Sequence, residues 1–186
     1  MNEPLPARQV RAVYDAETIT VYQAYDPHIA EPALAAQTFV SPFKRERMTW
    51  IKPSFLWMMY RSGWATKPGQ TRVLAIAVSR NGFAWALDNS CGSTPAADET
   101  HEAWKARLAA SPVRVQWDPE RDLQLNRLDY RAIQIGLSGE AVHRYVDEWI
   151  TAITDITPLA HQIAAHLNKG DTATARDLLP TERPYP

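Results

Sequence analysis

The sequence is nearly devoid of cysteine and has no long hydrophobic run, and both absences exclude classes of protein. A single cysteine among 186 residues excludes an internal disulfide and a zinc site built from several cysteines, and it fits a reducing cytoplasm. No apolar run reaches the roughly 18 residues of a membrane-spanning helix, and the N-terminus lacks the apolar segment of a signal peptide. We therefore expect a soluble, cytoplasmic protein with no membrane partner.

Several catalytic motifs are also missing. The sequence contains no GxSxG, GxxxxGK(S/T), GxGxxG, HExxH or CxxC pattern. The five histidines show no metal-ligand spacing, since His101 lacks a second His one helical turn later, and we expect no metal. Cys91 lies in the segment LDNSCGSTP, whose composition predicts a turn, so we interpret it as an incidental loop residue rather than a nucleophile.

The charge balance limits how the protein could meet a ligand. The formal net charge is −1 and 22% of the residues are charged, so no overall field would hold the chain on nucleic acid or an anionic membrane. Binding of an anion must therefore depend on a local group of basic residues. The sequence leaves the oligomeric state open.

One stretch, residues 44–64, combines three of the seven tryptophans with several Lys and Arg residues. This mixture is typical of one wall of a partly buried site, and it also fits a buried amphipathic helix with basic flanks. Pro53 and Gly63 predict a helix over residues 53–62, because proline suits the first turn of a helix and glycine its end.

Four segments are predicted strands because they are rich in β-branched and aromatic residues or alternate between apolar and polar positions. They are residues 18–25, 71–80, 113–117 and 130–137. We expect them to share one mixed or antiparallel sheet. The dipeptide Asn81-Gly82 predicts a hairpin that leads into a further strand at residues 82–87.

Helices are predicted between the strands, at residues 28–36 with Asp26 as N-cap, at 99–111, at 140–153 and from Pro158 onward. They do not separate the strands as regular βα units, so the expected fold class is α+β, a single domain with a mixed or antiparallel sheet flanked by helices. We place this domain at residues 8–179, between flexible tails at 1–7 and 180–186.

Polar residues on the predicted inner strands mark a candidate site. Gln23, Gln116 and Gln134 carry amides that need hydrogen-bond partners when they are buried. Aromatic rings stack on a flat base and guanidinium groups bind phosphate, so the basic and aromatic residues of the 44–64 stretch suit a nucleotide or the end of a nucleic acid. We expect one concave pocket bordered by Gln23, Trp50, Lys52, Tyr60 and Arg61.

Three long strings give a resemblance that covers nearly the whole chain. They are RQVRAVYDAETITVYQAYDPHIAEPAL, RMTWIKPSFLWMMYRSGW and YRAIQIGL. In these strings the chain resembles the bacterial family catalogued as domain of unknown function 4291. That resemblance implies no activity.

A looser resemblance concerns VYQAYDPHIAEPALAAQTF, residues 21–39. This segment is similar to the first motif of ADP-ribosyltransferases, in which a strand with an aromatic residue followed by His or Arg leads into a short helix. The resemblance implies a split mixed sheet, NAD as cofactor and a Glu on a late strand. The chain instead has Gln23 and, on the late strand, Gln134, which can hydrogen-bond ribose hydroxyls but cannot accept a proton.

Three functional hypotheses remain open. The first is an ADP-ribosyltransferase-like enzyme that binds NAD or a related nucleotide and transfers ADP-ribose to nucleic acid or protein. Its reacting centre would contain Gln23, Gln134 and Tyr60, and its cofactor would be held by Arg45, Arg47, Trp50, Lys52, Trp57 and Arg61. The second is a non-enzymatic module that binds a nucleotide, RNA or DNA with the same residues. The third is a protein-interaction surface, since Trp, Tyr and Arg dominate interface hot spots.

Overall fold

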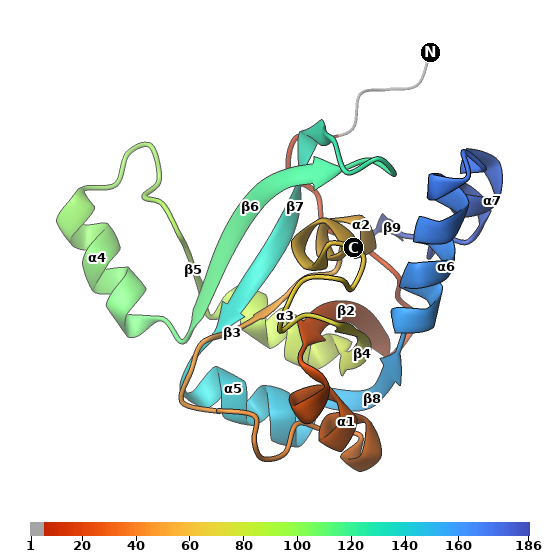
Figure 1. Ribbon diagram of the computed structural model, residues 1–186. Coiled ribbons are helices and arrows are strands. Elements are labelled where there is room, and N and C mark those ends of the chain that lie inside the picture. The colour runs from red at the N-terminus through yellow and green to blue at the C-terminus, as the bar shows by residue number, and fades with distance from the viewer. Residues whose placement is uncertain (1–5) are drawn as a thin grey trace.

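The structure is a computed structural model, and it describes residues 6–186. Of the N-terminal tail predicted at residues 1–7, residues 1–5 lie outside the described chain. Figure 1 shows helices arranged around a three-stranded and a four-stranded β-sheet, with the long hairpin of β6 (Val113–Arg121) and β7 (Arg127–Leu137) reaching the top of the view; a third sheet has only two short strands. The described chain forms an α+β domain, as the sequence predicted. None of its helices is long and apolar enough to cross a bilayer.

The larger sheet has four strands in the order β3, β7, β6, β5. They are β3 (Thr49–Ile51), β7 (Arg127–Leu137), β6 (Val113–Arg121) and β5 (Ser90–Gly92). β5 runs parallel to β6 and the other neighbours are antiparallel, so this sheet is mixed. Ile51 and Ile135 face the core, whereas Trp50, Gln116 and Gln134 share the opposite face, because side chains alternate along each strand.

The smaller sheet is antiparallel and has β4 (Arg72–Ser79) between β2 (Thr18–Tyr25) and β8 (Ile150–Asp155). The predicted strands thus exist, but β2 and β4 lie in one sheet while β6 and β7 lie in the other. The prediction of a single shared sheet was wrong. Alternation along a strand tells which face is buried, and it does not tell which strand lies beside it.

The two sheets meet where Tyr22 bridges to Lys52, and then diverge. The backbone N–H of Tyr22 donates to the carbonyl of Lys52 at 2.7 Å. An antiparallel register through this bridge would next pair Ala24 with Trp50. Instead, the carbonyl of Trp50 accepts from the side-chain Nε2 of Gln23 at 3.1 Å. A side-chain amide therefore takes the place of the next backbone contact at the point of divergence.

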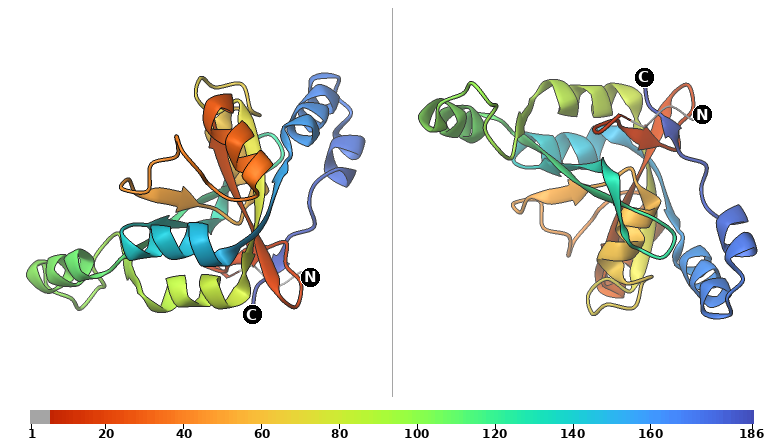
Figure 2. Two further views of the ribbon diagram at one scale, coloured as in Figure 1. Left: turned by 90° about the horizontal axis from the view of Figure 1, so that it is seen from below. Right: turned by 90° about the horizontal axis from the view of Figure 1, so that it is seen from above.

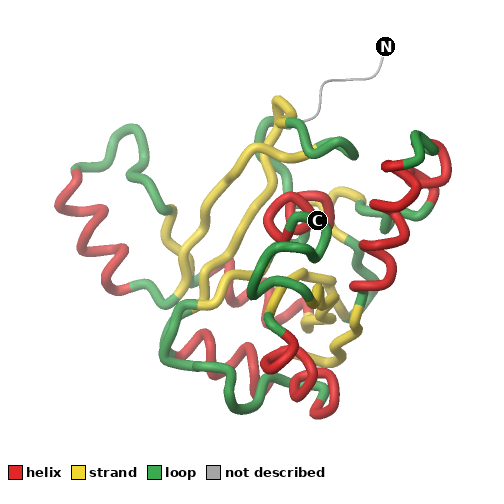
Figure 3. The backbone as a smooth tube through the Cα atoms, in the orientation of Figure 1, coloured by secondary structure: helices red, strands yellow, loops and turns green. Residues whose placement is uncertain are grey.

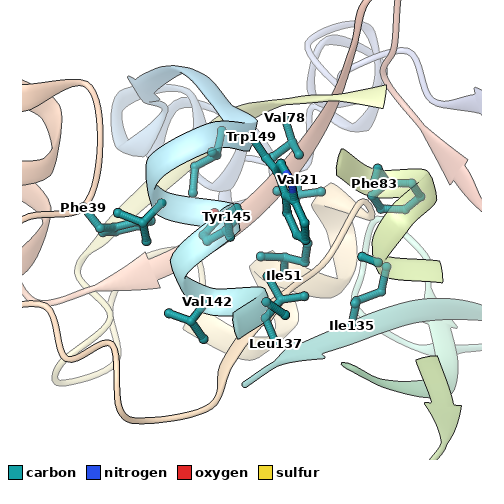
Figure 4. Close-up of a cluster of buried hydrophobic side chains, with 14 of the residues drawn as sticks. Val21, Phe39, Ile51, Val78, Phe83, Ile135, Leu137, Val142, Tyr145 and Trp149 are labelled. Atoms are coloured by element: carbon teal, nitrogen blue, oxygen red, sulfur yellow. The ribbon is translucent and has the colours of Figure 1, made fainter. Parts of the chain in front are cut away.

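The main core lies between the two sheets and the helical segment that starts at Glu140. This segment is α5 (Glu140–Arg144) followed by a π-helical turn, η1 (Tyr145–Trp149). Figure 4 shows Tyr145 and Trp149 of this turn among buried residues of both sheets, such as Val21 and Ile51. The predicted helix at 140–153 ends at Trp149, and the residues that follow form β8, whose β-branched composition favours a strand.

The hairpin predicted at Asn81-Gly82 is a helix, α3 (Arg80–Asp88). The side chain of Ser79 caps it by accepting from the backbone N–H of Gly82 at 3.2 Å. Gly82 is needed for close packing rather than for a turn, because a Cβ at this position would lie 2.3 Å from Cγ of Trp149. The Asn-Gly signal was therefore misread, since it reflects helix packing here.

Within residues 180–186, which the sequence predicted as a flexible tail, several side chains and a short strand contact the rest of the chain. β9 (Arg183–Pro184) pairs with β1 (Arg11–Ala12), and Tyr185 packs edge-on against Tyr14 with ring centroids 5.1 Å apart. The carboxylate of Glu182 accepts from the backbone N–H of Phe55 at 2.6 Å. Two residues of pairing are too short to be recognised from a strand pattern.

The remaining helices surround the sheets. α1 (Pro27–Ala36) begins after the N-cap Asp26, as predicted, and α2 (Phe55–Ser62) lies between the N-cap Ser54 and the left-handed Gly63. α6 (Thr157–Asn168) and α7 (Thr172–Asp177) pack together at one end of the molecule, as Figure 2 shows. α4 (His101–Ala110) projects at the opposite end and has no buried residue. Cys91 is buried in β5, which corrects its assignment to a loop.

Candidate functional site

A cleft opens where β2 and β3 diverge. Its volume is about 620 Å³, within the range of roughly 300–1,000 Å³ that is typical of small-molecule sites. Side chains from β2, α1, β3 and α2 line it, together with two loops that follow α1 and α2. Figure 3 shows both loops in green, running between the helices and the strands. The cleft is therefore built on rigid strands and helices and is bordered by loops.

Four basic residues line the cleft, namely Lys44, Arg47, Lys52 and Arg61. Lys52 is buried, with 4% of its surface exposed, and the other three are exposed. In the described part of the chain, no ion pair includes any of the four. The described lining also contains no Asp or Glu. The cleft thus gathers positive charge that has no ion-pair partner among residues 6–186.

Gln23 lines the cleft and joins the two sheets. Its Nε2 lies within hydrogen-bond distance of the Tyr25 hydroxyl (2.9 Å), the Thr49 hydroxyl (2.9 Å) and the Trp50 carbonyl (3.1 Å). Its Oε1 accepts from the hydroxyl of Tyr145 at 2.8 Å. Gln23 is only 3% exposed, and its hydrogen-bonding groups are already engaged within the protein. The sequence correctly indicated that this amide needs partners, and the structure shows that the partners are protein groups.

Lys52 lies at the centre of the polar groups beneath the cleft. Its Nζ donates to Oε1 of Gln134 on β7 and lies 4.0 Å from the centroid of the Trp57 ring. Burial lowers the pKa of Lys52 to about 7; the positive charge of Arg61 acts in the same direction, and the negative charge of Asp118 opposes both. Lys52 is therefore partly neutral near pH 7, unlike an exposed lysine.

Several predicted site residues lie elsewhere. Arg45 forms a two-pronged pair with Asp147, with Nη1–Oδ2 and Nη2–Oδ1 distances of 2.7 and 2.8 Å. Tyr60 does not line the cleft, and the centroid of its ring lies 3.5 Å from the guanidinium carbon of Arg121. Trp57 is buried beneath Lys52 and does not line the cleft. Only some of the predicted site residues therefore line the cleft.

Gln134 reaches the site through Lys52 rather than by lining the cleft. It lies on the same face of the large sheet as Gln116 and Trp50. Gln116 donates to Asp118 at 2.8 Å, and the second carboxylate oxygen of Asp118 is buried without a hydrogen-bond partner in the described chain. A polar layer therefore underlies the cleft on β6 and β7.

Aromatic side chains that the sequence did not single out complete the cleft. Tyr25 and Phe43 line it beside Trp50, and their ring centroids lie 6.1 Å apart in an edge-on arrangement. Burial raises the pKa of Tyr25 to about 12, so its hydroxyl stays protonated and available to the Gln23 amide. The aromatic run of β2 could have pointed to Tyr25. Phe43 lies in an irregular loop whose sequence has no periodic pattern.

The family model described as a domain of unknown function, DUF4291, matches residues 9–185. The chain belongs to this family. The match to DUF4291 covers β1 through β9, so the cleft and both sheets lie within the family domain. No curated protein matches the chain. The DUF4291 description assigns no activity, so the function must be argued from the cleft itself.

Proposed function

We propose that the cleft of this DUF4291 protein binds a nucleotide-like anion, with NAD and ADP-ribose as the dinucleotide candidates. The observation that carries the proposal is the convergence of Lys44, Arg47, Lys52 and Arg61 on a cleft whose described lining has no carboxylate. A group of unpaired cations is unfavourable in a folded protein unless an anion binds there, because like charges repel at short distance. A phosphate or pyrophosphate supplies that anion.

The shape of the cleft supports a ligand that also has a flat ring. Tyr25, Phe43 and Trp50 bring three aromatic side chains to the same space as the cations. The Trp50 ring packs tightly on Gly136, where a Cβ would lie 2.9 Å from the indole carbons, so the ring is fixed in place. A fixed ring stacks on a base with little loss of side-chain freedom. A nucleotide joins both chemical features in one molecule.

ADP-ribosyl transfer is a second candidate function. It is favoured by the position of Gln134, which lies one hydrogen bond from Lys52 below the cations of the cleft. Gln134 does not line the cleft, so it would act on a bound ribose only through Lys52, and an amide cannot stabilise an oxocarbenium-like centre by charge. We therefore propose ligand binding as the primary function, and transfer to nucleic acid or protein as an activity to be assayed with labelled NAD.

The test is isothermal titration of the protein with NAD, ADP-ribose, ADP and a short single-stranded RNA. Arg61→Ala should weaken the binding of whichever nucleotide binds, by about 1.5–3 kcal/mol or about tenfold to a hundredfold in Kd, since it removes a charged hydrogen bond to phosphate. Arg45→Ala is the matched control, because Arg45 pairs with Asp147 and does not line the cleft.

Two outcomes would contradict the proposal. If none of the four probes binds the wild-type protein, the cations must have another purpose. If Arg45→Ala weakens binding as much as Arg61→Ala, the ligand lies outside this cleft. Binding of RNA alone, with a steep dependence on salt concentration, would instead support a nucleic-acid module.

A further inference from the structure

Lys52 differs from the other cations of the cleft because it is buried, and within the described residues it forms no ion pair. Its Nζ donates to the amide oxygen of Gln134 and lies over the face of Trp57, and both contacts are with uncharged groups. Buried lysines usually have an ion-pair partner, because a lone ammonium loses its hydration in the protein interior. Lys52 is one of the residues that line the cleft, and burial without an ion pair is the setting in which proteins keep a reactive amine.

The groups around Lys52 favour its neutral form. Burial and the positive charge of Arg61 lower its pKa to about 7, and Asp118 on β6 opposes them. At pH 7 about half of the Lys52 side chains would be neutral, whereas an exposed lysine of pKa about 10.4 is neutral in roughly one molecule in 2,500. Desolvation and a neighbouring cation are the two features by which proteins activate a lysine as a nucleophile.

We propose that Lys52 condenses with the carbonyl group of a phosphorylated aldehyde bound in the cleft and forms an imine. The inference rests on the proposed function, because Lys44, Arg47 and Arg61 would hold the phosphate while the aldehyde reaches Lys52. Two kinds of ligand have this chemistry, a flat aromatic aldehyde phosphate and a nucleotide-linked sugar with a free aldehyde. ADP-ribose in its open-chain form belongs to the second kind.

The step needs no oxidant, reductant or further reactant. The lone pair of Nζ attacks the carbonyl carbon, and a proton moves from nitrogen to oxygen to give a carbinolamine. The carbon–oxygen bond then breaks, the oxygen leaves as water, and the carbon–nitrogen double bond forms. The second proton of this water is the one that remained on the nitrogen, so the step balances without a further reactant.

Reductive trapping tests the inference directly. The wild-type protein is incubated at pH 7 with cyanoborohydride and either pyridoxal 5′-phosphate or ADP-ribose, and modified lysines are located by peptide mass spectrometry. The chain has five lysines, so Lys44, Lys67, Lys105 and Lys169 act as internal controls. We expect Lys52 to be modified at least tenfold faster than any of them, and ADP to slow its modification. Lys52→Arg should keep the positive charge and lose this label.

The outcomes separate this inference from the proposed function. If ADP and ADP-ribose bind but neither aldehyde labels Lys52, the imine is overturned and nucleotide binding stands. If labelling is spread over the exposed lysines, or is strongest at Lys44, Lys52 is no special nucleophile. If no probe binds or labels, both proposals fail. Labelling of Lys52 by only one aldehyde supports the inference and identifies which kind of ligand the cleft accepts. Protection of wild-type Lys52 by ADP gives a readout even if Lys52→Arg does not fold.

Discussion

At the scale of single residues, Gln23 shows how one side chain can explain a feature of the whole fold. Sequence patterning indicated a polar residue on an inner strand, and the resemblance to ADP-ribosyltransferases suggested a catalytic position. In the structure, the oxygen of this amide accepts from the Tyr145 hydroxyl. Its nitrogen lies within hydrogen-bond distance of Tyr25, Thr49 and Trp50. A group with so many protein partners is better placed to hold the cleft open than to act on a ligand.

Replacing Gln23 should therefore lower stability before it affects binding. Gln23→Leu leaves the buried Tyr145 hydroxyl without its partner, at a cost of about 1–3 kcal/mol, and it removes one hydrogen bond from the Thr49 hydroxyl, which keeps the one to Tyr25. We expect the free energy of unfolding, measured in urea, to fall by about 2–4 kcal/mol. A variant with wild-type stability and lost nucleotide binding would show that Gln23 contacts the ligand.

At Gly82, replacement by alanine should lower stability, whereas Gly→Ala inside a helix usually raises it. Gly→Ala inside a helix normally stabilises by about 0.5–1 kcal/mol. Here the new methyl group would collide with the Trp149 ring, so Gly82→Ala should destabilise by about 1–3 kcal/mol. The measurement is thermal or urea unfolding, and adding Trp149→Leu should make the alanine less harmful than it is in the wild-type background. An increase in stability on Gly82→Ala alone would contradict the packing described above.

At the scale of secondary structure, the sequence predicted where strands and helices occur better than it predicted which strands lie side by side. β2, β4, β6, β7 and α1 were predicted from local patterns, and each exists near its predicted bounds. The shared sheet was wrong because pairing depends on distant residues, as in the bridge from Tyr22 to Lys52. The candidate site was partly predicted for a similar reason. Trp50 of β3 and Lys52, two residues later, alternate onto the cleft face, and Met58 and Arg61 reach the cleft from one face of α2, whereas Trp57 is buried outside the lining.

The pairing of β9 with β1 yields a prediction for the C-terminal end. Removal of residues 181–186 would delete β9, the hydrogen bond from Phe55 to Glu182, and the contacts of Tyr185 with Tyr14 and Phe83. We expect a melting temperature several degrees lower, since a loss of 1 kcal/mol shifts Tm by about 2–8 °C in domains of ordinary size. The control is removal of Pro186 alone. An unchanged Tm after the longer deletion would mean that these contacts contribute nothing.

At the scale of the whole molecule, the buried Lys52 and the partly buried Glu182 make stability depend on pH in opposite directions. Burial raises the pKa of Glu182 to about 8, and burial lowers that of Lys52 to about 7. Between about pH 4.5 and 8 the folded state keeps the Glu182 proton that the unfolded state has released, so this contribution to stability falls as pH rises. Between about pH 7 and 10.5 the unfolded state keeps the Lys52 proton that the folded state has released. The contribution of Lys52 to the free energy of unfolding therefore increases as pH rises through this range.

Matched variants separate the two groups. Glu182→Gln keeps an oxygen that can accept from Phe55 and removes the charge, so it should flatten the decline in unfolding free energy from pH 4.5 to 8. Lys52→Met should flatten the increase from pH 7 to 10.5. Each slope is at most about 1.4 kcal/mol per pH unit, and urea unfolding across the pH range measures it. Unchanged pH profiles in both variants would show that neither group titrates abnormally.

The position of α4 has a consequence for protein engineering. The helix contributes no buried residue, and it lies at the end of the molecule opposite to α6 and α7. None of its residues lines the cleft. Foreign sequence, such as a fluorescent reporter, should therefore be tolerated in the 93–100 loop before it, since insertions succeed at exposed segments with few buried contacts. This loop offers a place to attach a probe while the two sheets and the cleft between them stay intact.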